Sequence, residues 1–250
     1  MNYVYMSGAG NDFMVIDTRQ QTLDLSALAV KLCAITGADG FMAVDDSQIA
    51  DFKLHYYNSD GSRADLCGNG SRCICKYAYD HGIAGDTMTV ETDAGIVYGW
   101  RIAENEYRIR VTAPTQIDLN RKEGVDYAVC GVPHGLVELP GLTWEQKDAL
   151  REQAVALRYD PAFPQGANIN FYTWLGDGEI RVLTFERGVE DFTLACGTGC
   201  GALATALYTA GKLPGKVLTA HNPGGILKVT VEEAQGVITG LFLQGPAEYL

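Results

Sequence analysis

The sequence predicts a mixed α/β (α+β) protein made of two similar halves, in which each half wraps a sheet around one buried helix. Strand-like and helix-like segments alternate in both halves of the 250-residue chain. Cys67 and Cys196 lie about half the chain apart, and a Gly-x-Gly step and then a potential helix follow each of them. The second of these helical segments is apolar on every side, which is typical of a buried helix.

In the first half, strands and helices are predicted from apolar periodicity. Residues 14–16 are a short apolar run, and larger apolar residues alternate with more polar ones over 52–57, so both segments are predicted strands. Between them, apolar residues recur at helical spacing after Asp24 and stop at Gly37. A second helix is expected from Cys67 to near Gly82. Three further strands are expected at 87–92, 96–102 and 107–112.

The second half repeats this theme. Residues 143–146 (TWEQ) have the pattern of a capping box, which predicts a helix start. Strands are expected over 167–174 and 180–185, followed by the buried helix over 201–207, which ends at Gly211. Strands over 226–231 and 237–243 complete the set.

Strand signals pause at Ala113 and Pro114, where the boundary between two domains is predicted. The first domain is expected to cover 1–113, with Cys67, and to be joined by the C-terminal strand over 244–250. The second is expected to cover 114–243, with Cys196.

Composition and charge exclude several classes of protein. The formal net charge is −12, and no cluster of Lys and Arg suggests a nucleic-acid surface. No stretch approaches the ~20 apolar residues that span a bilayer, and the N-terminus does not resemble a signal peptide. With seven cysteines and no export signal, we expect reduced thiols in a cytoplasmic protein. An anionic ligand would have to be held by local donors, because the overall charge does not attract it.

The repeated cysteine motif, residues 66–70 (LCGNG) and 195–199 (ACGTG), suggests acid–base chemistry. Backbone N–H groups at a helix N-terminus stabilise a thiolate and lower the pKa of the thiol. Two such thiols can remove a proton from one face of a carbon and return one to the other face, exchanging roles with the reaction direction. The backbone amides of the two residues after each cysteine can bind a substrate carboxylate and stabilise a developing carbanion without a cofactor. These residues are Gly68, Asn69, Gly197 and Thr198.

A metal site is the main alternative for the cysteines. The spacings contain no Cys-x-x-Cys knuckle, so we expect no metal, although a non-catalytic metal-binding protein stays open as a different class of function. Cys73 and Cys75 cannot share one face of a helix and are expected to be packing residues. Cys33 and Cys130 are expected to be small buried hydrophobic residues.

Two other motifs have simple structural interpretations. Residues 8–13 (GAGNDF) lack the third glycine of a dinucleotide loop and are expected to form a turn between strands, where Asn11 could offer its amide to a ligand. His134 lies in residues 131–135 (GVPHG), which predict a tight turn whose histidine is hydrogen-bonded to backbone. A catalytic Cys–His couple would leave the second cysteine motif unexplained.

At these motifs the sequence resembles the diaminopimelate epimerase family. Two blocks carry most of the resemblance, 58–73 (NSDGSRADLCGNGSRC) and 194–199 (LACGTG), and together they are highly specific. Supporting segments are 7–13 (SGAGNDF), 166–171 (GANINF) and 186–188 (ERG). Weaker similarity extends over nearly the whole chain.

The resemblance implies two pseudo-symmetric domains, each with a curved, mostly antiparallel sheet around a central helix. It implies a cofactor-independent interconversion of LL- and meso-2,6-diaminoheptanedioate, without PLP, in lysine and peptidoglycan biosynthesis. It implies Cys67 and Cys196 as the acid–base pair. The residues it implies for holding this small-molecule substrate are Asn11, Asn58, Asn168, Glu186 and Arg187, with the amides after each cysteine. A homodimer is compatible with the sequence.

The chain departs from the family pattern at two positions. Many members have Asn in the loop ahead of Pro-His, where this chain has Val132, and some have Gln in place of Gly40. Relatives with this fold racemise other amino acids, such as histidine or proline. A PLP-independent racemase of another amino acid is therefore the alternative to the epimerase.

Overall fold

A computed structural model describes residues 3–19, 21–64 and 67–250 of the chain. The chain divides into two compact units. Unit 1 is Met1–Arg110 with Gln244–Leu250, and unit 2 is Val111–Leu243. Asp65 and Leu66, which belong to the first cysteine block, lie outside the described residues.

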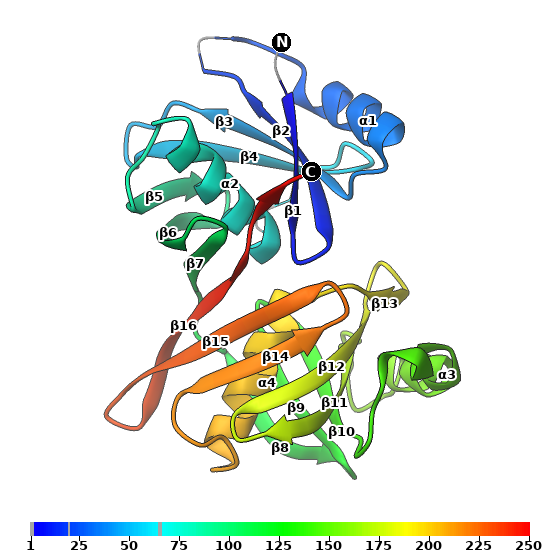
Figure 1. Ribbon diagram of the computed structural model, residues 1–250. Coiled ribbons are helices and arrows are strands. Elements are labelled where there is room, and N and C mark those ends of the chain that lie inside the picture. Colours follow the sequence, from blue (N-terminus) through cyan, green and yellow to red (C-terminus); the bar gives the residue numbers. More distant parts are fainter. Residues whose placement is uncertain (1–2, 20, 65–66) are drawn as a thin grey trace. The chain divides into compact units, whose positions relative to one another are not determined.

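Unit 1 contains two helices among mostly antiparallel strands (Figure 1). The helices are α1 (Leu25–Thr36) and α2 (Gly68–Asp80). The strands are β1 (Tyr3–Gly8), β2 (Asn11–Asp17), β3 (Gly40–Asp45), β4 (Phe52–Asn58), β5 (Thr87–Thr92), β6 (Gly95–Ala103), β7 (Glu106–Val111) and β17 (Glu248–Tyr249). Helix α1 has the predicted ends, since the Asp24 side chain accepts from Ala27 N and Gly37, at φ 75°, closes the last turn.

Unit 2 has the same kinds of elements. Its helices are a 3₁₀ turn η1 (Trp144–Gln146), α3 (Lys147–Arg158) and α4 (Gly197–Thr209). Its strands are β8 (Gln116–Lys122), β9 (Val125–Cys130), β10 (Val132–Glu138), β11 (Asn168–Gly176), β12 (Glu179–Glu186), β13 (Asp191–Thr193), β14 (Val217–Asn222), β15 (Gly225–Ala234) and β16 (Val237–Pro246), whose last residues belong to unit 1. The predicted capping box at Thr143 is present and starts η1, which leads into α3.

The two units repeat one order of strand pairing. In unit 1, β1 pairs antiparallel with β2, β2 parallel with β3, β3 antiparallel with β4, β4 parallel with β5, and β5 antiparallel with β6. In unit 2 the same alternation runs through β9, β10, β11, β12, β14 and β15. In each unit, helices connect the strands of the parallel pairs, because a parallel pair needs a crossover. The predicted fold of two pseudo-symmetric, mostly antiparallel halves is confirmed.

Strand register shows how closely the units correspond. In unit 1, Met42 lies beside Val15 on one neighbouring strand and Tyr56 on the other. In unit 2, Asn170 lies in the same way between Leu136 and Thr184. Met42 and Asn170 are therefore equivalent positions with different chemistry.

Helices α2 and α4 contact these equivalent positions, Met42 and Asn170, at a glycine in the first turn of each helix. A Cβ on Gly70, three residues after Cys67, would lie 3.0 Å from Met42 Sδ. A Cβ on Gly199, three residues after Cys196, would collide with Asn170 Oδ1. Neither glycine has an unusual backbone conformation, so what glycine provides at both positions is close contact between helix and sheet.

Each central helix is buried in its own unit. Helix α2 packs on β1, β2, β3 and β6, and α4 packs on β8, β9, β10, β14 and β15 (Figure 1). As expected, the sulfurs of Cys73 and Cys75 are buried packing groups in α2, and Cys33 and Cys130 are buried too. Strands β1, β3, β8, β9, β10, β13 and β14 were not among the predicted segments.

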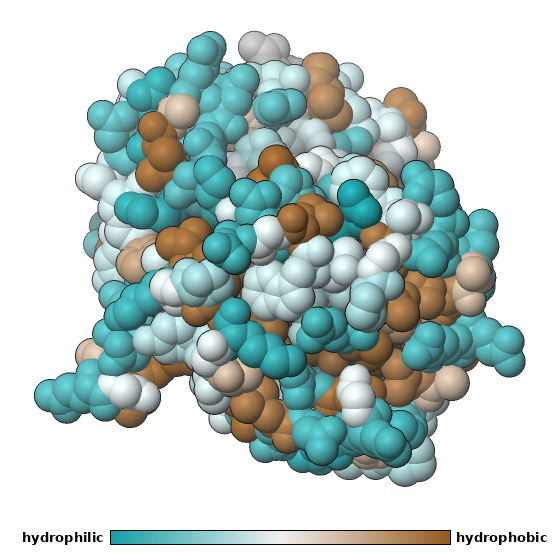
Figure 2. Space-filling view, turned by 60° about the horizontal axis from the view of Figure 1, so that its bottom comes forward, coloured by the Kyte–Doolittle hydropathy of each residue, from teal (hydrophilic) through white to brown (hydrophobic). Residues whose placement is uncertain are grey.

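A helix that crosses a membrane must be both long and apolar. Within 3–19, 21–64 and 67–250, no helix is both long and apolar enough to cross a bilayer. On the face in Figure 2, hydrophilic residues are interspersed with small hydrophobic groups. Exposed large hydrophobic residues are spread over many elements, such as Ile35 on α1 and Leu175 on β11, which is ordinary for a folded protein.

Candidate active site

In unit 1, Cys67 is the residue that precedes the first turn of α2. It has extended backbone angles, φ −127° and ψ 121°, and its carbonyl accepts from Ser71 N. Its side chain is half-buried and its Sγ lies 3.5 Å from Asn11 Oδ1, to which the thiol donates. The sulfur therefore lies beside the N-terminus of a helix, as predicted.

The side-chain amide of Asn11 is held in position by the carboxylate of Asp39. Its Nδ2 donates to Asp39 Oδ2 at 2.6 Å, and the same oxygen accepts from Asp12 N. This bond orients the amide so that Oδ1 faces the sulfur of Cys67. Residues 8–13 form the expected turn between strands, with Ala9 and Gly10 at positive φ.

Tyr56, on β4, is a neighbour of Cys67 that sequence reasoning did not select. Its phenol interacts electrostatically with the Cys67 side chain. Burial, with a smaller contribution from Cys67, raises the pKa of Tyr56 well above its ordinary value. The only signal in the sequence was the alternation over 52–57, which placed Tyr56 on the same face as Phe52 and Leu54.

The other expected residues of unit 1 are held in different ways. Asn58 is exposed, and its Nδ2 donates to Ser62 Oγ at the end of β4. Asn69 is buried in the first turn of α2, where its Oδ1 accepts from Arg72 Nη2. Arg72 is fully buried and also donates to the carbonyl oxygen of Gly68. Arg72 was not selected from the sequence, although its spacing of three residues from Asn69 is that of helical neighbours.

In unit 2, Cys196 occupies the same position at the start of α4. Its backbone angles, φ −120° and ψ 107°, nearly match those of Cys67. The side chain is 5% exposed, and its Sγ lies 3.4 Å from Thr198 Oγ1. Burial and then the Glu186 carboxylate raise the pKa of Cys196 well above its ordinary value, and hydrogen bonds from Thr198 and Gly199 oppose them only in part. The lowered thiol pKa expected at a helix N-terminus is thus overridden here by desolvation.

Glu186, Arg187 and Asn168 lie at the adjoining ends of β11 and β12. Glu186 Oε1 accepts from the Thr193 hydroxyl at 2.6 Å. Asn168 is buried and its Oδ1 accepts from Arg187 N, while Arg187 Nη1 donates to the carbonyl of Gln165. The structure therefore brings these three expected residues together at one edge of the unit 2 sheet.

His134 differs from the sequence expectation. It lies within β10, not in a tight turn, and its partner is a side chain rather than backbone, because Asn170 Nδ2 donates to His134 Nδ1 at 3.1 Å. Asn170 Oδ1 accepts in turn from the Thr184 hydroxyl. Burial and the charge of Arg187 lower the pKa of His134 to about 3, so the ring is neutral. The turn residue is Gly131, at φ 74°, and Val132 begins the strand.

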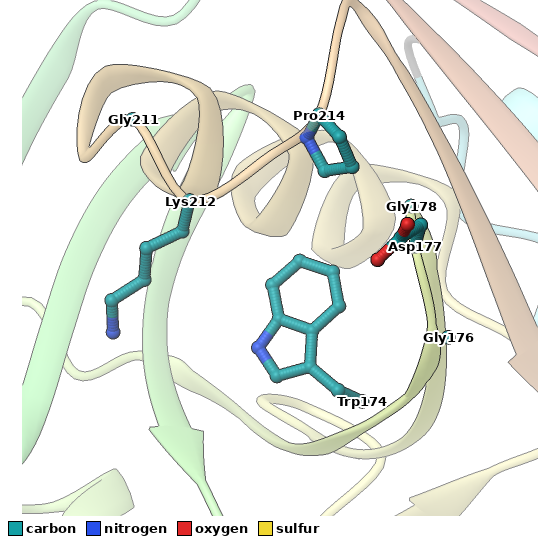
Figure 3. Close-up of a pocket in the computed structure, with 7 residues that line it drawn as sticks. All are labelled: Trp174, Gly176, Asp177, Gly178, Gly211, Lys212 and Pro214. Carbon is teal, nitrogen blue, oxygen red and sulfur yellow. The ribbon is translucent and has the colours of Figure 1, made fainter.

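The described residues offer no metal site, and the pocket among them lies away from Cys196. No group of three or more His, Cys, Asp or Glu side chains has an arrangement that could hold a metal ion. An open pocket lies at the other end of α4, lined by Trp174, Asp177, Lys212, Pro214 and neighbouring glycines (Figure 3). Since a helix of this length extends over ~20 Å, this pocket is remote from Cys196.

Comparison with known proteins agrees with this arrangement. A family model described as diaminopimelate epimerase matches residues 3–114 and 127–250. The diaminopimelate epimerase of Flavobacterium psychrophilum is 34% identical over 97% of this chain and 95% of its own length. The diaminopimelate epimerase of Aquifex aeolicus is 36% identical over 93% of this chain and 91% of its own length.

Solved structures show the same fold at low sequence identity. A PhzF-family phenazine biosynthesis protein of Bacillus anthracis has a TM-score of 0.79 at 17% identity, covering 100% of this chain and 98% of that one. A probable proline racemase of Agrobacterium radiobacter has a TM-score of 0.70 at 18% identity, covering 99% and 90%. With matches over almost its whole length, this chain belongs to the diaminopimelate epimerase family of isomerases.

Proposed function

We propose that the protein converts LL-2,6-diaminoheptanedioate to the meso isomer, without PLP or a metal, using Cys67 and Cys196 as two acid–base groups. The observation that carries the proposal is the duplication. Two units with the same strand order each hold a cysteine in the same backbone conformation before a buried helix. Two such groups, one on each face of a carbon, can remove a proton from one face and return one to the other.

The environments of the two sulfurs favour different resting states. Cys196 is buried and its pKa is raised, so it enters the reaction as the thiol. Cys67 then takes the α-proton as thiolate, and Cys196 delivers its own proton to the opposite face. The products are a Cys67 thiol and a Cys196 thiolate, which is the starting state for the reverse reaction.

The remaining residues would bind the substrate and stabilise the carbanion. Backbone amides at the start of α2 and α4, those of Gly68, Asn69, Gly197 and Thr198, point along the helix dipole and suit a carboxylate. The Arg187 guanidinium suits a second carboxylate and the Glu186 carboxylate suits an ammonium group. Asn11, Asn58 and Asn168 supply further polar contacts. Family membership supports this assignment, and we further propose that the enzyme acts in the cytoplasm on the route to lysine and peptidoglycan.

A substrate panel tests the proposal. The purified protein, without added cofactor, is offered LL-diaminopimelate, proline and histidine, and exchange of the α-proton with deuterium oxide is followed by NMR. We expect exchange and epimerisation with diaminopimelate alone. Exchange confined to proline or histidine would replace the epimerase with a racemase of that amino acid, the alternative that Val132 keeps open.

A further inference from the structure

Asp39 lies where three elements of unit 1 meet. It comes two residues after Gly37, which closes α1 at φ 75°, and directly before β3. Its backbone N donates to the carbonyl oxygen of Asp12 at 2.9 Å, and its Oδ2 accepts from Asp12 N at 2.9 Å. Because β2 and β3 pair in parallel from the next residue of each strand, backbone and side chain together hold the Asp39 carboxylate beside the start of β2.

The same carboxylate oxygen determines which way the Asn11 amide faces. Asn11 Nδ2 donates to Asp39 Oδ2 at 2.6 Å, a short bond of the kind expected with an ionised partner. An ionised carboxylate only accepts hydrogen bonds, so the amide presents its NH2 group to Asp39 and its oxygen to the other side. On that side the Cys67 thiol donates to Asn11 Oδ1, with Sγ at 3.5 Å. Asp39 thereby makes Asn11 an acceptor toward the sulfur.

An acceptor in this place stabilises one protonation state of Cys67. A thiol can donate to Oδ1, whereas a thiolate has no proton to donate and is matched by a donor such as an NH2 group. In the proposed function, Cys67 becomes a thiol when it removes the α-proton, and the reverse reaction begins from that thiol. Asn11 therefore holds the proton that Cys67 has gained, and no proton leaves Asn11 or Asp39 during the reaction.

Unit 2 has no such pair at the equivalent positions. By strand register Val132 has the place of Asn11, and Ala167 has the place of Asp39. Neither side chain can orient or accept a hydrogen bond. The sulfur of Cys196 meets instead a hydroxyl group of its own helix. The carboxylate–amide pair is thus a feature of the Cys67 environment and not a consequence of the duplicated fold.

We propose that Asp39 is a positioning residue, which acts through Asn11 to stabilise the thiol form of Cys67. The part of the proposal that concerns turnover rests on the proposed function, in which Cys67 is the base. Asp39 is exposed and fills no space in the core, so its side chain can be replaced without opening a cavity.

The direct test measures the sulfur itself. Trypsin releases residues 64–72, which contain Cys67 and no other cysteine, so alkylation by iodoacetamide can be followed by mass spectrometry over a pH series without substrate. In Asp39→Ala the Asn11 amide is free to turn its NH2 group toward a thiolate. We expect the pH of half-maximal alkylation to fall by about one unit. The acidic limb of the kcat/KM profile for LL-diaminopimelate should move down by the same amount.

Three further variants make the result specific. Asp39→Asn removes the charge but keeps an oxygen that can accept from both Asn11 Nδ2 and Asp12 N, so its midpoint should move less than half as far. Asn11→Ala removes the acceptor itself and should lower the midpoint on its own. In the double variant there is no amide to orient, so Asp39→Ala should have less than half of its effect in the wild type. Thermal unfolding of each variant reports whether the fold is retained.

The outcomes separate this inference from the proposed function. An unchanged alkylation midpoint in Asp39→Ala or in Asn11→Ala would overturn the role of Asp39 even in an active epimerase. Equal shifts in Asp39→Ala and Asp39→Asn would overturn it too, because charge alone would then account for the effect. So would a full effect of Asp39→Ala in the absence of the Asn11 amide.

The predicted shifts in a protein that does not exchange the α-proton of diaminopimelate would support the positioning of Asn11 by Asp39 and count against the proposed substrate. The alkylation assay does not depend on turnover, so it decides the first question alone.

Discussion

The two cysteine environments are built on the same backbone and differ in nearly every side chain. Each cysteine precedes a buried helix with a glycine three residues later. Beneath that glycine, unit 1 has Met42 and unit 2 has Asn170. Cys67 is half-buried and donates to the amide oxygen of Asn11, whereas Cys196 is buried, and its burial and then the Glu186 carboxylate raise its pKa. A duplicated fold can therefore place two sulfurs in the same backbone geometry and in different surroundings.

The largest expected effect is loss of either sulfur. Cys67→Ala and Cys196→Ala should each lower kcat for epimerisation at least ~10³-fold, because general acid–base groups contribute 10²–10⁴-fold each. The measurement is the rate of meso product formation by each purified variant. Cys33→Ala, which removes a buried sulfur from α1, is the matched control and should remain active. Substantial epimerisation by either of the first two variants would mean that one thiol suffices.

The equivalent glycines provide a sharper test of the comparison. Alanine normally stabilises a helix interior by ~1 kcal/mol relative to glycine. In Gly199→Ala the new methyl would meet Asn170 Oδ1, which His134 and Thr184 hold in place, so we expect a net loss of ~2 kcal/mol in the free energy of unfolding.

In Gly70→Ala the neighbour is the flexible end of Met42, and the free energy of unfolding should stay within ~1 kcal/mol of the wild type. Urea denaturation of the two variants measures the difference. If both variants lost the same free energy of unfolding, Asn170 would not be more rigidly held than Met42, contrary to this account.

A third prediction concerns pH. His134 has a pKa of about 3 in the folded protein and about 6.5 when unfolded, so the unfolded chain binds the extra proton as the pH falls. The stability linked to His134 is therefore complete above pH ~6.5 and decreases toward the folded pKa. Between pH 7 and pH 5 the loss should be ~2 kcal/mol, since one pH unit corresponds to ~1.4 kcal/mol.

The matched variant is His134→Phe, because Phe13 has the equivalent register position in unit 1. Its absolute stability will differ, but the change between pH 7 and pH 5 should be ~2 kcal/mol smaller than in the wild type. Urea denaturation at both pH values gives this difference. The same pH dependence in both proteins would mean that another group is responsible.

Local sequence patterns predicted the elements whose ends are set locally. Asp24 and Gly37 define α1, and the apolar run over 201–207 identified α4 as buried. Strands such as β3 and β10 were missed because their residues do not alternate between apolar and polar. Their strand conformation is set by pairing with neighbouring strands in the sheet. The two cysteines were found because the motif is local.

The chemistry of the site was less predictable because it depends on packing. Asn11 meets Cys67 only when the turn between β1 and β2 and the start of α2 have been brought together, and Gly40 makes room for Tyr56 only once β3 and β4 are paired. The sequence revealed that Cys196 precedes a helix, which on its own would lower the pKa of the thiol. It did not reveal that the thiol is buried, and burial raises the pKa. His134 was misinterpreted because Gly131 and Pro133 suggested a turn where β10 already begins.

The most direct test of the central claim is isotope labelling at low conversion. LL-diaminopimelate is incubated with the wild-type protein in deuterium oxide, and the product and the recovered substrate are analysed by NMR. If one sulfur removes the α-proton and the other supplies a solvent-derived deuteron, the meso product carries deuterium at the inverted carbon while the recovered substrate retains protium. Product that retains the original proton would show that one group both removes and returns it, and would contradict the two-cysteine account.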